Sequence, residues 1–120
     1  MDLVEDKHNS DFNITKYSCG KLVINKMSYS KPIVFYNSAI SVFDISNPES
    51  ISYEDIKGYA SSIDLILIGT GSSALILNEV FIKRMFDENK GLEFMNTESA
   101  CKTHNLLLSE NRSFVSILYP

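Results

Sequence analysis

The chain has 120 residues, of which 44% are hydrophobic and 22% are charged, and this composition fits one domain with a substantial core. Its net charge of −4 argues against the basic surface that nucleic acids and anionic lipids attract, and it has no apolar run long enough for a membrane-inserted helix. Two cysteines, Cys19 and Cys101, are too few for a disulfide framework or a metal cluster, and they indicate a reducing compartment. The sequence does not exclude a single disulfide bond between them.

The first eleven residues are polar and acidic, without the basic and apolar segments of a signal peptide. We therefore expect residues 1–11 to form a disordered tail and residues 12–120 to form one α/β domain. The predicted location is the cytoplasm.

Two strand pairs are predicted in the first 45 residues. Residues 12–17 and 21–25 are rich in β-forming side chains and flank a short Ser-Cys-Gly segment, which indicates a β-hairpin. Residues 32–36 and 39–43 flank the turn Asn37-Ser38 and predict a second pair.

A short helix and a buried strand follow. Ser52, with Asp55 three residues later, predicts a helix start and places Tyr53, Ile56, Tyr59 and Ala60 on one face. Residues 65–68 are four consecutive large aliphatic residues that stop at Gly69-Thr70-Gly71, a pattern typical of a strand buried on both faces that delivers a tight loop.

The rest of the chain alternates helix and strand. Asn78 predicts the cap of a helix over residues 79–90 that ends at Gly91, with an inner face of Val80, Phe81, Ile82 and Met85. A strand at 92–95 completes a parallel βαβ unit, Thr97 is expected to cap a helix that runs to about Glu110, and 113–119 form a last strand. This order predicts an α/β domain with an extra β layer.

The carboxyl ends of neighbouring parallel strands suggest a binding crevice. Free N–H groups at a helix start, with hydroxyl groups nearby, can bind a carboxylate or phosphate. Arg112 would complete such a site if it pointed into the crevice; in the alternative, Thr97 only caps its helix and Arg112 pairs with Glu110 at the surface. The candidate residues are Gly69, Thr70, Gly71, Ser72, Asn96, Thr97, Ser99 and Arg112.

Residues 69–74 match the dinucleotide fingerprint G-x-G-x-x-G/A. The match lies past the midpoint of the chain, however, and the next strand ends at Asn96 rather than at an acidic residue. We therefore expect a structural glycine turn, and no NAD, FAD or other cofactor.

Cys101 and His104 are three residues apart on one predicted helix. An exposed thiol near a helix start would be nucleophilic, and a histidine could serve as its base. The favoured interpretation is a small buried cysteine and a packed histidine ring. No Ser/His/Asp set, paired-carboxylate motif or metal-ligand cluster accompanies them, which favours a protein that is not an enzyme.

One set of residues in the carboxyl half forms a recognisable pattern: 65–71, 95–97, Ala100, Cys101, 103–105, Leu107, Glu110 and Arg112, with Tyr17 and Gly20 in the amino half. With this pattern the chain resembles the Mth938-like family, which has mostly unassigned functions and includes the mitochondrial complex I (NADH:ubiquinone oxidoreductase) assembly factor 3 and the adipogenesis-associated Mth938 domain-containing protein. The resemblance covers 64–120 well and 12–63 more loosely. It departs at Asn96 and His104, where the family commonly has Asp and an aromatic residue.

The resemblance implies a three-layer domain with a central mixed sheet, an added β-hairpin layer and covering helices. It implies no established chemistry. Our first hypothesis is a non-catalytic accessory protein that binds another protein, in the assembly of a membrane or respiratory complex. The alternative is a small-molecule or anion-binding protein, enzymatic or not, that uses the loop crevice. The sequence leaves the partner, the ligand and homo-oligomer formation open.

Overall fold

A five-stranded mixed sheet forms the centre of the computed structural model, which describes residues 10–120. Its strands lie in the order β5 (Ala39–Val42), β4 (Ile33–Tyr36), β8 (Phe114–Leu118), β6 (Leu65–Gly69) and β7 (Gly91–Met95). β6 is parallel to both β7 and β8, whereas β4 is antiparallel to β8 and to β5. The parallel βαβ unit and the hairpin around Asn37-Ser38 are therefore confirmed.

The amino-terminal strands form a separate sheet of β1 (Ile14–Ser18), β2 (Lys21–Ile24) and β3 (Met27–Tyr29). The predicted hairpin is present, and the short β3 strand extends it on the free side of β2. The disorder predicted for residues 1–11 falls mostly on residues 1–9, which lie outside the described residues. Ser10–Phe12 form a short 3-10 helix.

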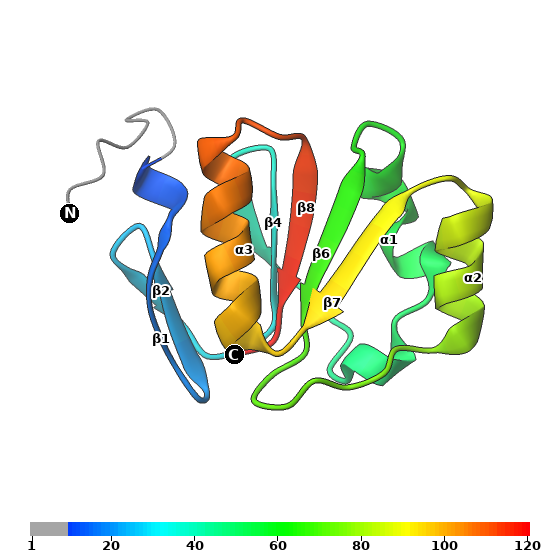
Figure 1. Cartoon of the computed structure of the whole chain (residues 1–120). Coiled ribbons are helices and arrows are strands. Elements are labelled where there is room, and N and C mark those ends of the chain that lie inside the picture. The colour runs from blue at the N-terminus through cyan, green and yellow to red at the C-terminus, as the bar shows by residue number, and fades with distance from the viewer. Residues whose placement is uncertain (1–9) are drawn as a thin grey trace.

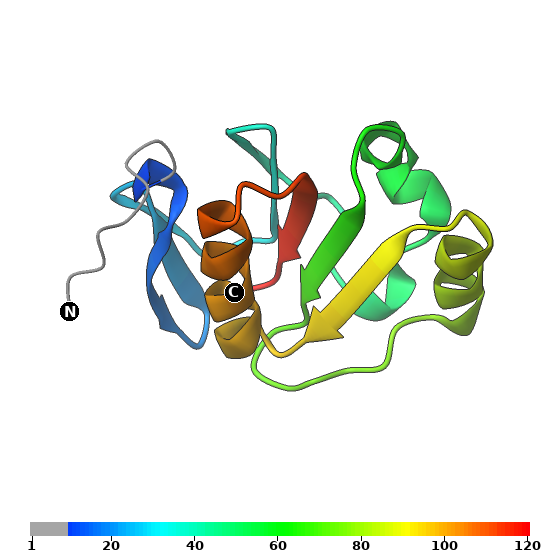
Figure 2. The same ribbon diagram turned by 45° about the horizontal axis from the view of Figure 1, so that its top comes forward.

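Helices cover both faces of the central sheet. α1 (Tyr53–Ala60) and α2 (Glu79–Asp87) lie on one side, and α3 (Thr97–Ser109) packs between β6 and β8 on the other side and the small sheet. In Figures 1 and 2 the order along the long axis is the small sheet, α3, β8, β6, β7 and α2. The molecule is thus an α/β domain, as the sequence pattern predicts, with the three layers and the mixed central sheet that the family resemblance implies.

The continuous aliphatic run of β6 fills the cores on both of its faces. Ile66 and Ile68 pack with the residues under α1 and α2, whereas Leu65 and Leu67 pack with those under α3 and the small sheet. All four side chains are buried. This explains why β6 lacks the apolar and polar alternation of a half-exposed strand.

The small sheet is attached to α3 by polar contacts as well as by packing. The Asn105 side chain accepts a hydrogen bond from the Ile14 N–H at 2.7 Å and donates to the Ile14 carbonyl at 3.0 Å. His104 Nε2 donates to the Phe12 carbonyl at 3.0 Å. Two consecutive residues of α3 therefore fix the position of the chain at the start of β1.

Three local predictions on the helices need correction. α2 ends at Asp87 rather than Lys90, because Asn89 turns the chain with a φ of 61° and Gly91 already belongs to β7. Val80 is exposed rather than part of the inner face, which consists of Phe81 and Met85 with Ile82 partly buried. The caps that Ser52 and Asn78 predict are present: Asp55 accepts from the Ser52 N–H, and Asn78 accepts from two N–H groups of α2.

The third correction concerns the start of α3. Asn96, not Thr97, is the cap, and its side-chain oxygen accepts from the Ser99 N–H at 2.9 Å. Thr97 is the first residue of the helix and is fully buried. The Thr97 hydroxyl group therefore does not cap α3 and can form other hydrogen bonds.

Candidate functional site

The two loops predicted to form a crevice do lie side by side. β6 and β7 are parallel neighbours, with Gly69 paired to Met95 at their carboxyl ends. The loop that follows β6 and the start of α3 therefore meet at one edge of the sheet. The sequence placed these two segments correctly.

The buried Thr97 side chain connects the backbone segments at this edge. Its hydroxyl group donates to the Tyr119 carbonyl at 2.7 Å and accepts the Gly71 N–H at 2.7 Å, while the Thr97 N–H donates to the Gly71 carbonyl at 2.8 Å. One side chain thus links the loop after β6, the start of α3 and the end of the chain. Neither the Gly71 N–H nor the Thr97 N–H is left to bind an anion.

Thr70 is used in the same way. Its N–H donates to the Met95 carbonyl at 2.8 Å, and its Oγ1 accepts from the Leu75 N–H at 3.2 Å. The hydroxyl proton has two carbonyl acceptors within reach, Ser73 at 2.6 Å and Met95 at 3.1 Å. With Thr70 buried, this hydroxyl group serves the loop's own conformation.

Gly69 shows how tightly the edge is packed. A Cβ atom there would lie 2.9 Å from the Ala100 Cβ and 2.9 Å from the Thr97 Oγ1, so a side chain does not fit without movement of α3. Gly71 has a φ of 99°, which disfavours any residue with a side chain. The glycines bring two backbone segments together, whereas Ser72 and Ser99 are exposed on the outside of the edge.

Arg112 is not brought to this edge. β8 is parallel to β6, so the residue before β8 lies at the amino ends of the strands, opposite Gly69 and Thr97. Its guanidinium Nη1 lies 3.6 Å from a Glu110 carboxylate oxygen, and both side chains are about half exposed. The local pairing that was the alternative interpretation is therefore present, and the anion site that combined Arg112 with the loop crevice is not formed.

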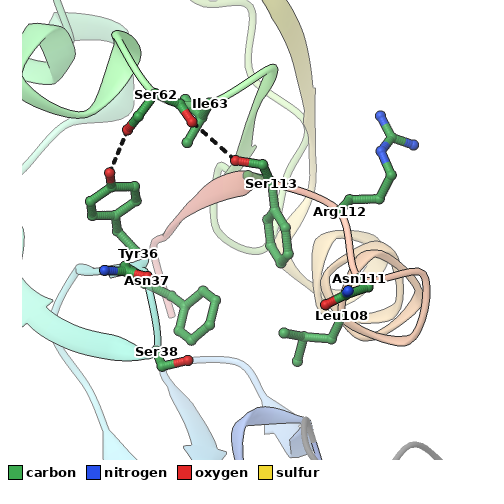
Figure 3. Close-up of a pocket in the computed structure, with 11 residues that line it drawn as sticks. Tyr36, Asn37, Ser38, Ser62, Ile63, Leu108, Asn111, Arg112 and Ser113 are labelled. Carbon is green, nitrogen blue, oxygen red and sulfur yellow. Dashed lines mark hydrogen bonds between the residues drawn. The ribbon is translucent and has the colours of Figure 1, made fainter.

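A cavity of about 380 Å³ opens instead at the amino ends of β6 and β8 (Figure 3). Its wall comes from the β4–β5 turn, the connection from α1 to β6 and the connection from α3 to β8. The Tyr36 hydroxyl group and Ser62 Oγ are 2.5 Å apart, and Ser113 Oγ donates to the Ser62 carbonyl at 3.1 Å. Of the residues that line this cavity, the sequence singled out Arg112 alone as a site residue, although the βαβ rule also makes β8 parallel and places its preceding loop at this end.

Cys101 and His104 are both buried and cannot act as a nucleophile and its base. Burial raises the pKa of the Cys101 thiol to about 11, with a further rise from the Glu98 carboxylate, and burial lowers the pKa of His104 to about 4. Because the Phe12 carbonyl only accepts, Nε2 carries the proton and Nδ1 accepts from the Ser116 hydroxyl at 2.8 Å. The favoured prediction of a buried cysteine and a packed histidine is confirmed, and both cysteines are free thiols.

A second cavity, of about 390 Å³, lies between the starts of α1 and α2. Its lining includes the apolar side chains of Ile51, Val80 and Phe81, and the Arg84 guanidinium stacks 4.3 Å above the Tyr53 ring. Val80 is 77% exposed, although it lines this cavity. The cavity therefore presents apolar side chains at the surface of the molecule.

Within residues 10–120, no group of three or more His, Cys, Asp or Glu side chains is arranged to hold a metal ion. The longest helix described is α3, with 13 residues, and none of the described helices has the length and apolar character needed to cross a membrane.

Comparisons with known proteins give a family and a fold. A family model described as "Protein of unknown function (DUF498/DUF598)" matches residues 14–119. The "13 kDa major membrane protein" of Francisella tularensis subsp. holarctica is 30% identical over 122 residues, with 98% of each chain covered. The NADH dehydrogenase [ubiquinone] 1 alpha subcomplex assembly factor 3 of Xenopus tropicalis is 26% identical over 110 residues, and the match spans 89% of this chain and 60% of that relative.

Solved structures share the fold. A crystal structure of a Bordetella parapertussis protein matches with a TM-score of 0.80 and 25% identity, covering 90% of this chain and 94% of that one. A solution structure of a Bordetella pertussis protein, described as a Mth938-like domain, matches with a TM-score of 0.76 and 22% identity, covering 100% and 92%. The resemblance to the Mth938-like family is therefore confirmed.

Proposed function

The chain belongs to the DUF498/DUF598 family, the Mth938-like family that includes complex I assembly factor 3, and on this basis we propose that it is a non-catalytic accessory protein that binds another protein. The relatives named as assembly factors support an accessory role in building a respiratory or membrane complex. The buried, pKa-shifted states of Cys101 and His104 support a role without nucleophilic catalysis.

The observation that carries the proposal is the apolar cavity between the starts of α1 and α2, which Ile51, Val80 and Phe81 help to line. Val80 is 77% exposed, whereas Ile51 and Phe81 are buried. A single exposed apolar residue is ordinary, but one that lines an apolar cavity is a feature of protein-binding surfaces. We propose that the partner places an apolar side chain in the cavity that Val80 lines.

Site-specific photo-crosslinking in cells tests this surface. A photoreactive phenylalanine analogue replaces Val80 in one variant and Leu106 in a matched control, because Leu106 is also a large exposed apolar residue on a helix but belongs to α3. We expect a discrete crosslinked band from position 80 and none from position 106. Equal bands from both positions, or no band from position 80, would contradict the proposal.

We propose the cytoplasm as the compartment, since the exposed Cys19 and the buried Cys101 are both free thiols, as is usual in a reducing compartment. One relative is named as a membrane protein, so fractionation of cells that express the untagged chain is the direct test. Recovery in the membrane pellet that resists high salt would contradict this part of the proposal.

The alternative function, a small-molecule or anion-binding protein, is weakened at the loop crevice because Thr70 and Thr97 use its polar groups internally. The open cavity at the opposite edge of the sheet is the observation that favours ligand binding, and it leads to a separate inference.

A further inference from the structure

The cavity at the amino ends of β6 and β8 has the size and shape of a small-molecule site. Its volume of about 380 Å³ lies within the usual range for such sites, about 300–1,000 Å³. Its floor is made of Phe35, Ile63 and Phe114, which are buried, and its rim is polar. An apolar floor under a polar rim suits a ligand that presents both kinds of surface.

The wall of the cavity is held in place before any ligand arrives. Tyr36, Ser62 and Ser113 are joined by the hydrogen bonds drawn in Figure 3, and the Asp64 N–H donates to the Ser113 carbonyl at 3.3 Å. These bonds link β4, the start of β6 and the start of β8. A site whose wall is already ordered loses less entropy when a ligand binds.

The rim carries polar side chains without a hydrogen-bond partner among residues 10–120. They are the amide groups of Asn37 and Asn111 and the hydroxyl group of Ser38. An amide group both donates and accepts, and so does a hydroxyl group. Such a set matches a ligand that is rich in hydroxyl groups.

The charges around the cavity largely cancel. Among the described residues that line the cavity, Arg112 is the only Lys, Arg, Asp or Glu. Its Nη1 atom lies 3.6 Å from a carboxylate oxygen of Glu110. α1 and α3 both end at this cavity, and the carboxyl end of a helix carries partial negative charge. Lys90 offsets part of that charge, since its ammonium group donates to the Ile63 carbonyl at 3.3 Å. The balance favours a ligand without net charge, and in Figure 3 Arg112 extends away from Tyr36 and Ser62.

We propose that this cavity binds a neutral, hydroxyl-rich small molecule, such as a monosaccharide or polyol, through Asn37, Ser38 and Asn111, with the Tyr36 ring along one side. The inference does not depend on the proposed protein-binding cavity between α1 and α2, which lies elsewhere in the fold.

An NMR titration of the full-length protein tests the proposal. Glucose, ribose, mannitol and myo-inositol are added separately to the ¹⁵N-labelled chain. We expect saturable shifts for at least one of them, confined to 36–38, 62–64 and 111–114. Gluconate and glucosamine serve as anionic and cationic counterparts of glucose, and both are expected to bind more weakly than the neutral sugar.

Two variants remove the rim amides without straining the backbone. Asn37 and Asn111 have φ values of 54° and 57°, which glycine adopts readily, so Asn37→Gly and Asn111→Gly should fold normally. Each is expected to raise the dissociation constant about three- to tenfold, as the loss of one or two hydrogen bonds would. Asn89→Gly, at a φ of 61° beyond the end of α2, is the matched control and should leave binding unchanged.

The proposal is overturned if none of the four neutral probes gives saturable shifts at these residues, or if Asn37→Gly and Asn111→Gly bind as tightly as the original chain. Tighter binding of gluconate or glucosamine than of glucose would also overturn it, because a charged ligand would then be preferred.

Discussion

The two ends of the central sheet differ in how they use their polar groups. At the carboxyl ends of β6 and β7, Thr70 and Thr97 bind neighbouring backbone groups, and Gly69 leaves no space for a side chain. At the amino ends of β6 and β8, amide and hydroxyl groups surround an open cavity. Ligands of open α/β sheets usually bind at the carboxyl ends of strands. In this protein the carboxyl ends of β6 and β7 are filled by internal contacts, and the cavity lies at the amino ends of β6 and β8.

The largest effect is expected from filling the closed end. Gly69→Val places side-chain atoms against Ala100, Thr97 and Leu118, where even one Cβ atom would be 2.9–3.2 Å from its neighbours. We expect a loss of about 3 kcal/mol in the free energy of unfolding, at the upper end of the cost of overpacking. Urea denaturation measures it.

Gly58→Ala is the control for that experiment. Gly58 lies in α1, and a Cβ atom there would meet nothing within 4 Å. Alanine should stabilise the protein by about 0.5–1 kcal/mol, because it favours the helix. If Gly69→Val were as stable as the original chain, the carboxyl edge would not be closed as described.

A change of pH is expected to act on the core between the two ends. His104 has a pKa of about 4 in the folded protein because it is buried, against an ordinary value of 6.5. Between these two pKa values the unfolded chain takes up a proton at His104 that the folded chain does not. The contribution of neutral His104 to the free energy of unfolding is therefore fully present above pH 6.5 and is lost as the pH drops towards 4. The full loss is about 3 kcal/mol, at 1.36 kcal/mol for each pKa unit.

Denaturation curves at pH 7, 6 and 5 check this effect, with His104→Phe as the comparison. The variant lacks the titrating group and should show a flatter dependence on pH in this range. Parallel curves for the two proteins would show that His104 is not the group responsible.

Removing the central hydroxyl group of the closed end should have a smaller effect. Thr97→Val keeps the shape of the side chain but leaves the Tyr119 carbonyl and the Gly71 N–H without their partner. We expect a loss of about 2 kcal/mol, the cost of burying unsatisfied polar groups. The matched change at the open end, Ser38→Gly at a φ of 60°, should alter stability by less than about 0.5 kcal/mol. Comparable losses at both ends would remove the distinction between them.

The local features of the sequence predicted the fold well. The aliphatic run of β6, the caps at Ser52 and Asn78 and the hairpin turn at Asn37-Ser38 all involve residues close together in the chain, where propensity and capping decide the outcome. The sequence does not predict the short β3 strand, because three residues are too few to show an alternating pattern.

The site was harder to predict because it depends on contacts between distant residues. Thr97 reads as a cap from sequence, and only the position of Tyr119 at the end of β8 explains why its hydroxyl group is buried and used. The sequence leaves open whether Arg112 points into the loop crevice, and only the pairing of β8 with β6 places it at the opposite end of the sheet. The two loops at the carboxyl edge were paired correctly, since neighbouring parallel strands bring their ends together.

Hydrogen exchange at the Gly71 amide tests the closed edge most directly, because its acceptor is the buried Thr97 hydroxyl group at 2.7 Å. We expect protection similar to that of the Tyr119 amide, which donates to the Gly69 carbonyl, and a large loss of protection at Gly71 in Thr97→Val. The Ser38 amide, at the tip of the open end, should exchange quickly. A Gly71 amide that exchanges as fast as that of Ser38 would mean that the loop after β6 is open, and would contradict a carboxyl edge closed by Thr97.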